Sequence, residues 1–193
     1  MRTKLKKISK LDNAPVILIR DKQFELFIEE KIILERVCNI SKQIKRDLHD
    51  KNPLFICVLN GAFMFASDLM KHFDFPCEIT FIRLKSYVGT SSSESIKEVH
   101  GLIENIKDRN VVILEDIVDT GFTIQYLKQS SLAQQPKSLR IATLLLKPEA
   151  FQTKIKVDYV AMEIPNDFIV GYGLDYDGYG RNLRDIYKIK KHV

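Results

Sequence analysis

The 193-residue sequence has few cysteines and no long hydrophobic run. Its three cysteines, Cys38, Cys57 and Cys77, form no Cys-x-x-Cys pair, and the last two lie in apolar runs. This pattern indicates buried, reduced thiols that act as small hydrophobic residues rather than disulfides. No apolar stretch is long enough to cross a bilayer, and the basic residues after Met1 lead into no apolar core of a signal peptide. We therefore expect a cytoplasmic protein with no membrane partner.

Charge of one sign is also lacking, because 30 Lys and Arg face 25 Asp and Glu, for a net charge of +5. The excess lies at the two ends of the chain, in Lys4, Lys6, Lys7, Lys10, Lys188, Lys190, Lys191 and His192. No aromatic side chains alternate with these charges, as they do on single-stranded nucleic acid surfaces. Solvated tails are therefore favoured over a polyanion-binding surface, and no nucleic acid partner is expected.

Hydrophobic residues alternate between helical and strand-like spacing along the chain. Helical spacing predicts one or two helices over 24–48, one over 62–73 and one ending near 134. Short apolar runs predict strands at 54–59, 78–84, 111–114, 139–146 and 157–164. This order predicts one α/β domain over 1–193 with a largely parallel sheet. The small, polar segment 89–95 predicts a flexible loop, either a linker or a mobile cover for a site.

The most informative segment is 111–123, V-V-I-L-E-D-I-V-D-T-G-F-T. A buried strand presents Glu115 and Asp116 at its carboxyl edge, where ligands bind in open α/β sheets. Asp119 follows, and a Thr-Gly-x-Thr sequence then opens a helix. The free backbone N–H groups of a helix start, a turn at Gly121 and two hydroxyl groups together suit a phosphate group.

Three carboxylates beside a phosphate cradle need a reason, because on their own they would repel an anion. They are accounted for if they hold sugar hydroxyls, bind a magnesium ion or accept a proton. The alternative is an ordinary helix with Asp119 as its N-cap and the other two acids merely exposed.

This segment resembles the phosphoribosyl pyrophosphate-binding motif of the type I phosphoribosyltransferases, particularly of their hypoxanthine-guanine branch. The resemblance extends over 10–189 and implies a mainly parallel central sheet flanked by helices, with a small hood formed by the termini. It implies that Asp119 is the general base at the purine N7. The implied donor-binding and 5-phosphate-binding residues are Glu115, Asp116, Asp119, Thr120, Gly121, Phe122 and Thr123. Phe122 replaces the commoner Lys or Asn, and backbone N–H groups should preserve phosphate binding.

Residues 58–69 are similar to the family's pyrophosphate loop, in which a cis non-proline peptide is expected at Leu59–Asn60. Asn60 replaces the commoner Lys or Arg, so affinity must come from backbone N–H groups, the metal and other residues. Without the resemblance, Asn60-Gly61 is an ordinary turn pair. Ser86-Tyr87 resembles the start of the mobile flap that excludes water from the reacting atoms. The implied pyrophosphate-binding residues are Asn60, Gly61, Ser86, Tyr87 and Arg181.

The last third of the chain resembles the family's purine pocket. There, the lysine matching Lys147 donates to the 6-oxygen of the purine, which selects 6-oxopurines because adenine would leave the donor unpaired. Taken alone, a lysine after a strand is usually solvated. Within 163–176, Phe168 is expected to stack on the base. The implied purine-binding residues are Lys147, Phe168, Ile169 and Asp175. The implied ligands of the Mg²⁺ cofactor are Glu115, Asp116 and Asp175.

The expected activity is purine salvage, in which the 5-phosphoribosyl group moves from phosphoribosyl pyrophosphate to N9 of hypoxanthine, and of guanine, giving IMP or GMP and pyrophosphate. The resemblance also implies a homodimer or homotetramer. Xanthine remains open, because Lys147 would serve any 6-oxopurine. The other alternative is a nucleotide-sensing regulator of the same fold that binds nucleic acid. Such a protein needs a basic face or an added DNA-binding domain, and neither is evident.

Overall fold

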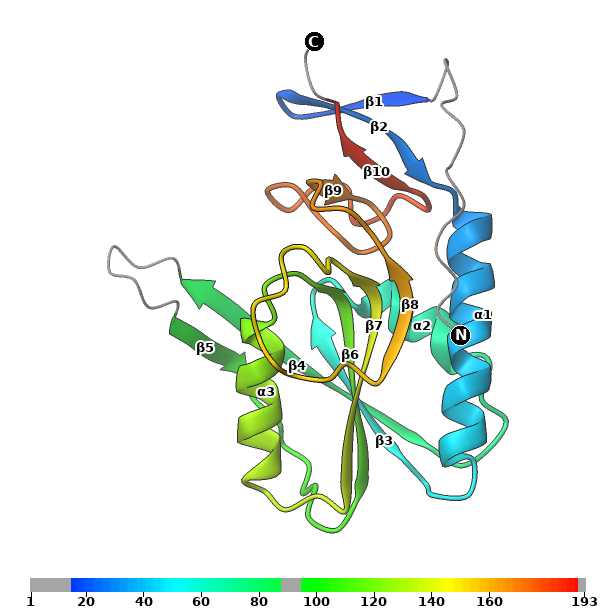
Figure 1. The fold of residues 1–193 in the computed structure, drawn as a ribbon, viewed down its shortest axis with the longest axis vertical. Helices are drawn as coiled ribbons and strands as arrows, with labels where there is room; N and C mark the ends of the chain where they lie inside the picture. The colour runs from blue at the N-terminus through cyan, green and yellow to red at the C-terminus, as the bar shows by residue number, and fades with distance from the viewer. Residues whose placement is uncertain (1–14, 88–94, 191–193) are drawn as a thin grey trace.

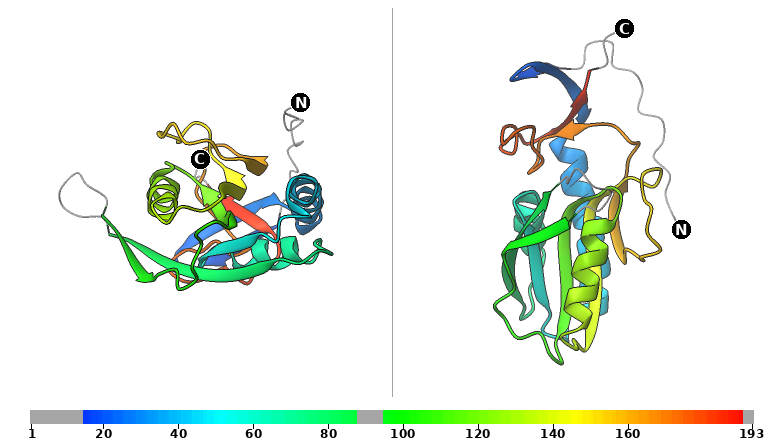
Figure 2. Two further views of the ribbon diagram at one scale, coloured as in Figure 1. Left: turned by 90° about the horizontal axis from the view of Figure 1, so that it is seen from below. Right: turned by 90° about the vertical axis from the view of Figure 1, so that its left-hand side faces the viewer.

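The computed structural model of the chain describes residues 15–87 and 95–190. In this part of the chain, a six-stranded sheet carries helices on its two faces (Figure 1). A separate four-stranded antiparallel sheet lies beyond the carboxyl ends of the parallel strands (Figures 1 and 2). We call this smaller sheet the hood.

The large sheet has the strand order β5-β4-β3-β6-β7-β8. Its strands are β3 (Leu54–Leu59), β4 (Glu78–Tyr87), β5 (Ser95–His100), β6 (Asn110–Val118), β7 (Ser138–Leu146) and β8 (Tyr159–Glu163). All neighbours pair in parallel except β5, which is antiparallel to β4. The predicted strands and the largely parallel sheet are therefore confirmed. They were predictable because strands covered on both faces are continuously apolar.

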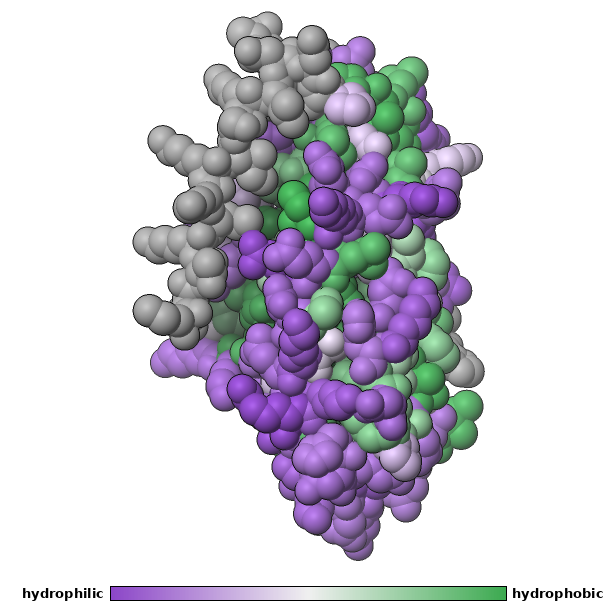
Figure 3. Space-filling model, turned by 90° about the vertical axis from the view of Figure 1, so that its right-hand side faces the viewer, coloured by the Kyte–Doolittle hydropathy of each residue, from purple (hydrophilic) through white to green (hydrophobic). Residues whose placement is uncertain are grey.

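Three helices cover the sheet: α1 (Glu30–Leu48), α2 (Phe63–Met70) and α3 (Phe122–Leu132). Helices α1 and α2 pack on the face that carries Phe55 and Cys57, and α3 packs on the face that carries Ile56 and Val58. Alternate residues of β3 thus enter two different cores, as the pleat requires. The surface on the α1 side, where grey atoms do not cover it, is mainly hydrophilic (Figure 3).

The hood contains β1 (Val16–Ile19), β2 (Lys22–Ile28), β10 (Ile186–Ile189) and β9 (Ile169–Val170), in this spatial order. The helical prediction for 24–48 is therefore wrong at its start, because 24–28 belong to β2. Phe24, Leu26 and Ile28 face inward at every second position, and β2 pairs with β10 from the other end of the chain. This pairing outweighs the local helical spacing, which continues correctly in α1.

The cysteines and part of the basic C-terminal end lie among the described residues. Cys57 is buried, Cys38 and Cys77 are half-buried, and all three are free thiols. At the C-terminal end, Lys188 Nζ lies 3.2 Å from Glu25 Oε1 across β10 and β2. The basic residues before residue 15 and after residue 190, and the loop 89–95 before Ser95, lie outside the described residues. Within residues 15–87 and 95–190, no helix combines the length and apolar character needed to span a membrane.

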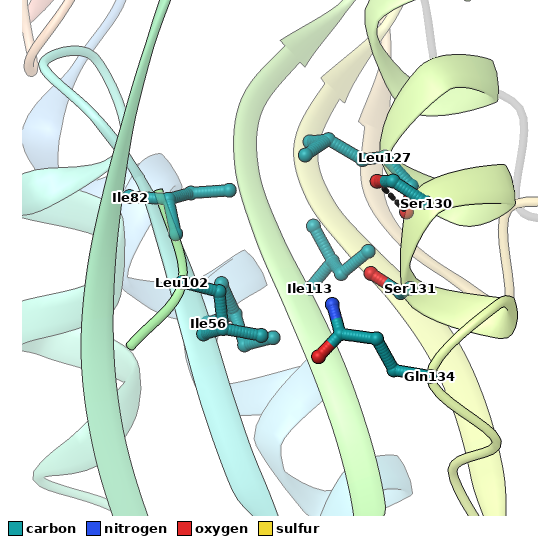
Figure 4. Close-up of a pocket in the computed structure, with 8 residues that line it drawn as sticks. All are labelled: Ile56, Ile82, Leu102, Ile113, Leu127, Ser130, Ser131 and Gln134. Atoms are coloured by element: carbon teal, nitrogen blue, oxygen red, sulfur yellow. Dashed lines mark hydrogen bonds between the residues drawn. The ribbon is translucent and has the colours of Figure 1, made fainter. Parts of the chain in front are cut away.

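A small cavity of about 70 Å³ lies between the sheet and the second half of α3 (Figure 4). Its lining residues are Ile56, Ile82, Leu102, Ile113, Leu127, Ser130, Ser131 and Gln134. The strand residues among them lie at mid-strand, and none is a predicted site residue. We therefore regard this cavity as a packing gap and look for the site at the carboxyl ends of the strands.

Candidate active site

The two adjacent acids lie inside β6 rather than after it. Glu115 pairs with Thr143 of β7, and the ladder continues to Val118 and Leu146. The strand is thus longer than the apolar run that predicted it. Because strand residues alternate between faces, Glu115 and Asp116 are held on opposite sides of a hydrogen-bonded strand.

Glu115 is the more buried of the two acids. Glu115 is 7% exposed, and its Oε2 atom has no hydrogen-bond partner among residues 15–87 and 95–190. Burial, and then the neighbouring Asp116, raise the pKa of Glu115 well above its usual value. A buried carboxyl without a partner is costly for the fold. Such a carboxyl group is a candidate for binding a ligand.

Asp116 is half-buried, and its Oδ1 atom accepts the backbone N–H of Ile117 at 2.8 Å. Burial raises the pKa of Asp116 to about 6, and the charge of Asp175 adds to the rise. Backbone hydrogen bonds and the nearby Arg181 act in the opposite direction. Asp116 and Arg181 are 65 residues apart in the sequence, and Asp175 lies between them. The fold has thus brought three predicted site residues into electrostatic contact.

Gly61 lies directly against the Asp116 carboxylate. A Cβ atom placed on Gly61 would be 1.5 Å from Asp116 Oδ2. On Gly173, a Cβ atom would be 2.0 Å from the carbonyl oxygen of Gly61. Gly61 of the predicted pyrophosphate loop therefore lies between Asp116 of β6 and Gly173 of the loop before Asp175, and the predicted cis peptide at Leu59–Asn60 is present.

The predicted phosphate cradle is formed at the start of α3, where Gly121 is the N-cap. Gly121 has φ +89°, and a Cβ atom there would be 2.5 Å from Phe151 Cε2 and 2.7 Å from Thr153 Oγ1. Only glycine suits this position. No side chain caps the helix, so its first backbone N–H groups remain able to bind an anion. The alternative with Asp119 as the N-cap is wrong.

Asp119 instead pairs with Lys147, and the two charged atoms, Nζ and Oδ2, are 2.7 Å apart. The Lys147 side chain is 9% exposed and that of Asp119 is 45% exposed. The ordinary expectation of a solvated lysine is thus wrong here. The backbone N–H of Lys147 donates to the Val118 carbonyl at 3.0 Å. This bond brings the ends of β6 and β7 together, so that the side chains of Lys147 and Asp119 lie side by side.

Phe168 and Ile169 lie where the hood meets the sheet. Phe168 is 44% exposed, and Ile169 is buried in β9. The Phe168 ring packs edge-on against Tyr176 with centroids 5.9 Å apart. Lys22 Nζ lies 5.7 Å from the Phe168 centroid and 4.5 Å from that of Tyr176. Nothing in the sequence indicated that Lys22 lies over these two rings, because no motif surrounds it. The aromatic composition of 172–176 could have indicated Tyr176.

A cleft of about 450 Å³ opens beside the pyrophosphate loop. Its lining residues are Leu59, Asn60, Phe63, Gly178, Tyr179, Gly180, Arg181 and Asn182. It joins two predicted pyrophosphate residues, Asn60 and Arg181, which are far apart in the sequence. Arg181 is fixed by Nη2 to Asp175 Oδ1 at 2.6 Å and by Nη1 to the Gly173 carbonyl at 2.7 Å.

The remaining predicted residues are placed less completely. Ser86 and Tyr87 end β4, where their backbones pair with Ile96 and Ser95 of β5. Phe122, at the first position of α3, is 40% exposed. The contacts predicted for these side chains with a phosphorylated donor remain predictions.

A magnesium ion suits the carboxylates in one particular way. No cluster of three or more His, Cys, Asp or Glu side chains forms a ready metal cage within the described part of the chain. Asp175 also pairs with Arg181 and accepts the Gly178 N–H at 2.6 Å. Mg²⁺ commonly keeps several waters and binds through one or two carboxylates plus substrate phosphates. The buried, mutually repelling acids fit that mode, in which the donor supplies the other ligands.

Comparison with known proteins shows the family to which the chain belongs. The phosphoribosyl transferase domain matches residues 28–177, and the chain therefore belongs to the phosphoribosyltransferase family. A crystal structure of a hypoxanthine-guanine phosphoribosyltransferase from Bacillus anthracis superposes with a TM-score of 0.82 at 36% identity, covering 86% of this chain and 98% of that one. The type I fold predicted from the sequence is thus confirmed.

Within the family, the chain resembles one branch. A hypoxanthine-guanine phosphoribosyltransferase of Streptococcus pyogenes is 42% identical over 170 residues, which are 88% of this chain and 94% of that protein. One from Streptococcus mutans is 43% identical over 169 residues, which are 87% and 93% of the two chains. The resemblance stated from the motifs is therefore confirmed.

The raised pKa of Asp116 predicts a pH-dependent cost to stability. The folded protein favours the protonated form of the Asp116 carboxyl group. The contribution of Asp116 to the free energy of unfolding should therefore fall as the pH rises from about 4 to about 6. Asp116→Asn keeps the acceptor for Ile117 and removes the charge. It should raise the free energy of unfolding by about 2–3 kcal/mol at pH 7.5 and by much less at pH 4. Urea unfolding at both pH values measures this, with the exposed Glu149→Gln as control; an equal gain at both pH values would contradict it.

The contact of Gly61 with Asp116 predicts that Gly61→Ala destabilises the fold. The added methyl group would overlap the carboxylate, so we expect about 1–3 kcal/mol loss in the free energy of unfolding, as for other overpacked sites. Urea unfolding measures the loss. Asp116→Ala in the same chain should recover most of it, since it empties the space. No recovery in the double variant would show that the strain lies elsewhere.

Proposed function

We propose that the chain transfers the 5-phosphoribosyl group of phosphoribosyl pyrophosphate to N9 of hypoxanthine, and of guanine, forming IMP or GMP and pyrophosphate. The observation that supports this best is the Lys147–Asp119 pair. It puts a buried ammonium group and a carboxylate together beside the phosphate cradle at Gly121. A 6-oxopurine offers an acceptor at O6 and an acidic N–H at N7, which match such a pair.

The donor is assigned to the groups around β6. Its 5-phosphate would accept backbone N–H groups at the start of α3 and hydroxyls of Thr120 and Thr123. The ribose hydroxyls would bind Asp116 and Glu115, whose Oε2 atom has no hydrogen-bond partner among the described residues. Its diphosphate would lie in the cleft that Asn60 and Arg181 line.

The purine is assigned to the space between Phe168 and Lys147. The half-exposed Phe168 ring offers a stacking surface for the base. The backbone of Ile169 would read the base edge, while Lys147 leaves Asp119 to donate to O6. Asp119 would then be free to take the proton from N7 as N9 attacks C1 of the sugar.

The acids and the metal share the charge of the reaction. Asp175, with Glu115 and Asp116, would hold Mg²⁺, which supplies charge neutralisation for the departing pyrophosphate. Positive charge develops on the sugar ring, and the β6 carboxylates would stabilise it. Ser86 and Tyr87 would exclude water from the closed site.

Support for an enzyme comes from the relatives, which are named as hypoxanthine-guanine phosphoribosyltransferases. The nucleotide-sensing regulator has no support among them. We also propose a homodimer or homotetramer on the basis of the family. An activity assay with hypoxanthine, guanine, xanthine and adenine, each with Mg²⁺ and phosphoribosyl pyrophosphate, tests the proposal. Turnover should occur with the 6-oxopurines hypoxanthine and guanine; turnover with adenine alone, or with no purine, would overturn it.

Asp119→Asn tests the proton acceptor. The amide keeps the shape of the side chain but cannot take the N7 proton, so kcat should fall by about 100-fold or more while nucleotide still binds. Steady-state kinetics and a nucleotide titration measure the two properties. Asp50→Asn, at an exposed position in the turn after α1, serves as control. Unchanged kcat would remove Asp119 from this role.

Lys147→Met tests base selection. The substitution removes the donor but keeps the length of the side chain, so KM for hypoxanthine and guanine should rise about 10- to 100-fold, as loss of a hydrogen bond from a charged donor implies. The KM for phosphoribosyl pyrophosphate should change little. The exposed Lys156→Met is the matched control. Equal weakening of both substrates would mean that Lys147 has a structural role.

A further inference from the structure

The turn that leads from β9 into Asp175 has an unusual backbone. Gly171, Tyr172 and Gly173 all have positive φ, at +104°, +48° and +98°. Glycine occupies two of these positions, but the left-handed conformation is unfavourable for a bulky residue such as Tyr172. A bulky residue keeps such a conformation only where the surroundings fix it.

Tyr172 is fixed by its ring and by its hydroxyl group. The residue is 1% exposed, and its hydroxyl donates to Asp68 Oδ2 on α2 at 2.6 Å. The other oxygen of Asp68 accepts Lys71 Nζ at 2.7 Å. Burial, and then the hydrogen bond and charge of Asp68, raise the pKa of Tyr172. The hydroxyl therefore stays protonated near neutral pH and remains a donor.

This bond joins helix α2 to the turn at 171–173, and both segments are close in the chain to residues that line the cleft. Helix α2 begins at Phe63, so Asp68 lies on the helix that follows Asn60 and Gly61. Tyr172 lies in the turn before Asp175, whose Gly173 also touches the Gly61 carbonyl. Arg181 Nη1 donates to the Gly173 carbonyl. The turn is thus attached to the pyrophosphate loop at Gly173 and to its helix at Tyr172.

We propose that Tyr172 and Asp68 are a pair of positioning residues that set the separation between the pyrophosphate loop and Asp175 and Arg181. Neither residue lines the cleft, so the pair acts through the loops rather than on the substrate. The inference rests on the proposed function, because it assigns this cleft to the diphosphate of the donor. It predicts an effect on the donor and not on the purine.

Tyr172→Phe is the first test, since it removes only the hydroxyl. We expect KM for phosphoribosyl pyrophosphate, and the Kd of donor with Mg²⁺ by calorimetry, to rise on the order of tenfold, as small misplacements of binding groups do. The KM for hypoxanthine should stay within about twofold. Asp68→Ala should have the same effect, and Asp68→Asn, which keeps an acceptor, should restore most of the affinity. The Tyr172→Phe, Asp68→Ala double variant should be no worse than either single variant.

Two controls separate positioning from general loss of stability. Tyr159→Phe removes a similar bond, from a buried tyrosine hydroxyl to Asp47 Oδ2 at 2.9 Å, at the opposite end of the parallel strands. Lys71→Ala removes the second contact of Asp68. Both controls should leave donor KM and Kd within about twofold of wild type.

Several results would overturn the positioning role. One is an unchanged donor Kd in Tyr172→Phe, and another is equal weakening of donor and purine. A donor effect of the same size in Tyr159→Phe would also overturn it. If the wild-type chain binds the donor but transfers it to no purine, the proposed function fails alone, because the Kd comparison still tests the pair. A wild-type chain that does not bind the donor contradicts both.

Discussion

The carboxylate of Asp116 lies against the α-carbon of Gly61, and the carbonyl of Gly61 lies against the α-carbon of Gly173. Neither glycine has room for a side chain, so three segments from β6, the β3–α2 turn and the turn after β9 meet at their closest possible approach. Several of the residues proposed to bind the donor lie next to this contact. Asn60 is adjacent to Gly61, Asp175 and Arg181 follow Gly173, and Glu115 precedes Asp116. The close approach of these three segments therefore contributes to the geometry of the cleft.

The same arrangement places negative charge where the fold cannot easily tolerate it. Glu115 has a buried oxygen that finds no partner in the described part of the chain, and burial raises the pKa of both Glu115 and Asp116. Arg181 offsets part of this charge near Asp116, and Lys147 offsets that of Asp119. A bound cation and sugar hydroxyls would relieve the rest. Stability is thus sacrificed at the point where ligand binding would recover it, as is common at functional sites.

Much of this could be predicted from the sequence, and the failures have physical causes. The continuous apolar runs of β3 and β7 and the motif at 115–123 are local signals, so these strands and the helix start at Gly121 were predictable. Strand β2 was not, because its partner β10 lies at the other end of the chain and Phe24 to Ile28 also fits helical spacing. The burial of Lys147, the position of Lys22 over Phe168 and the Tyr172–Asp68 bond depend on contacts between distant segments. No local pattern reports such contacts.

The central claim is that the β6 acids, the start of α3 and the cleft form one site for a phosphorylated sugar donor. A crystal structure with phosphoribosyl pyrophosphate and Mg²⁺ tests it most directly. The account predicts the 5-phosphate on the backbone N–H groups after Gly121, the ribose hydroxyls at Glu115 and Asp116, and the diphosphate between Asn60 and Arg181. A donor bound elsewhere in the molecule, with these groups left free, would contradict it.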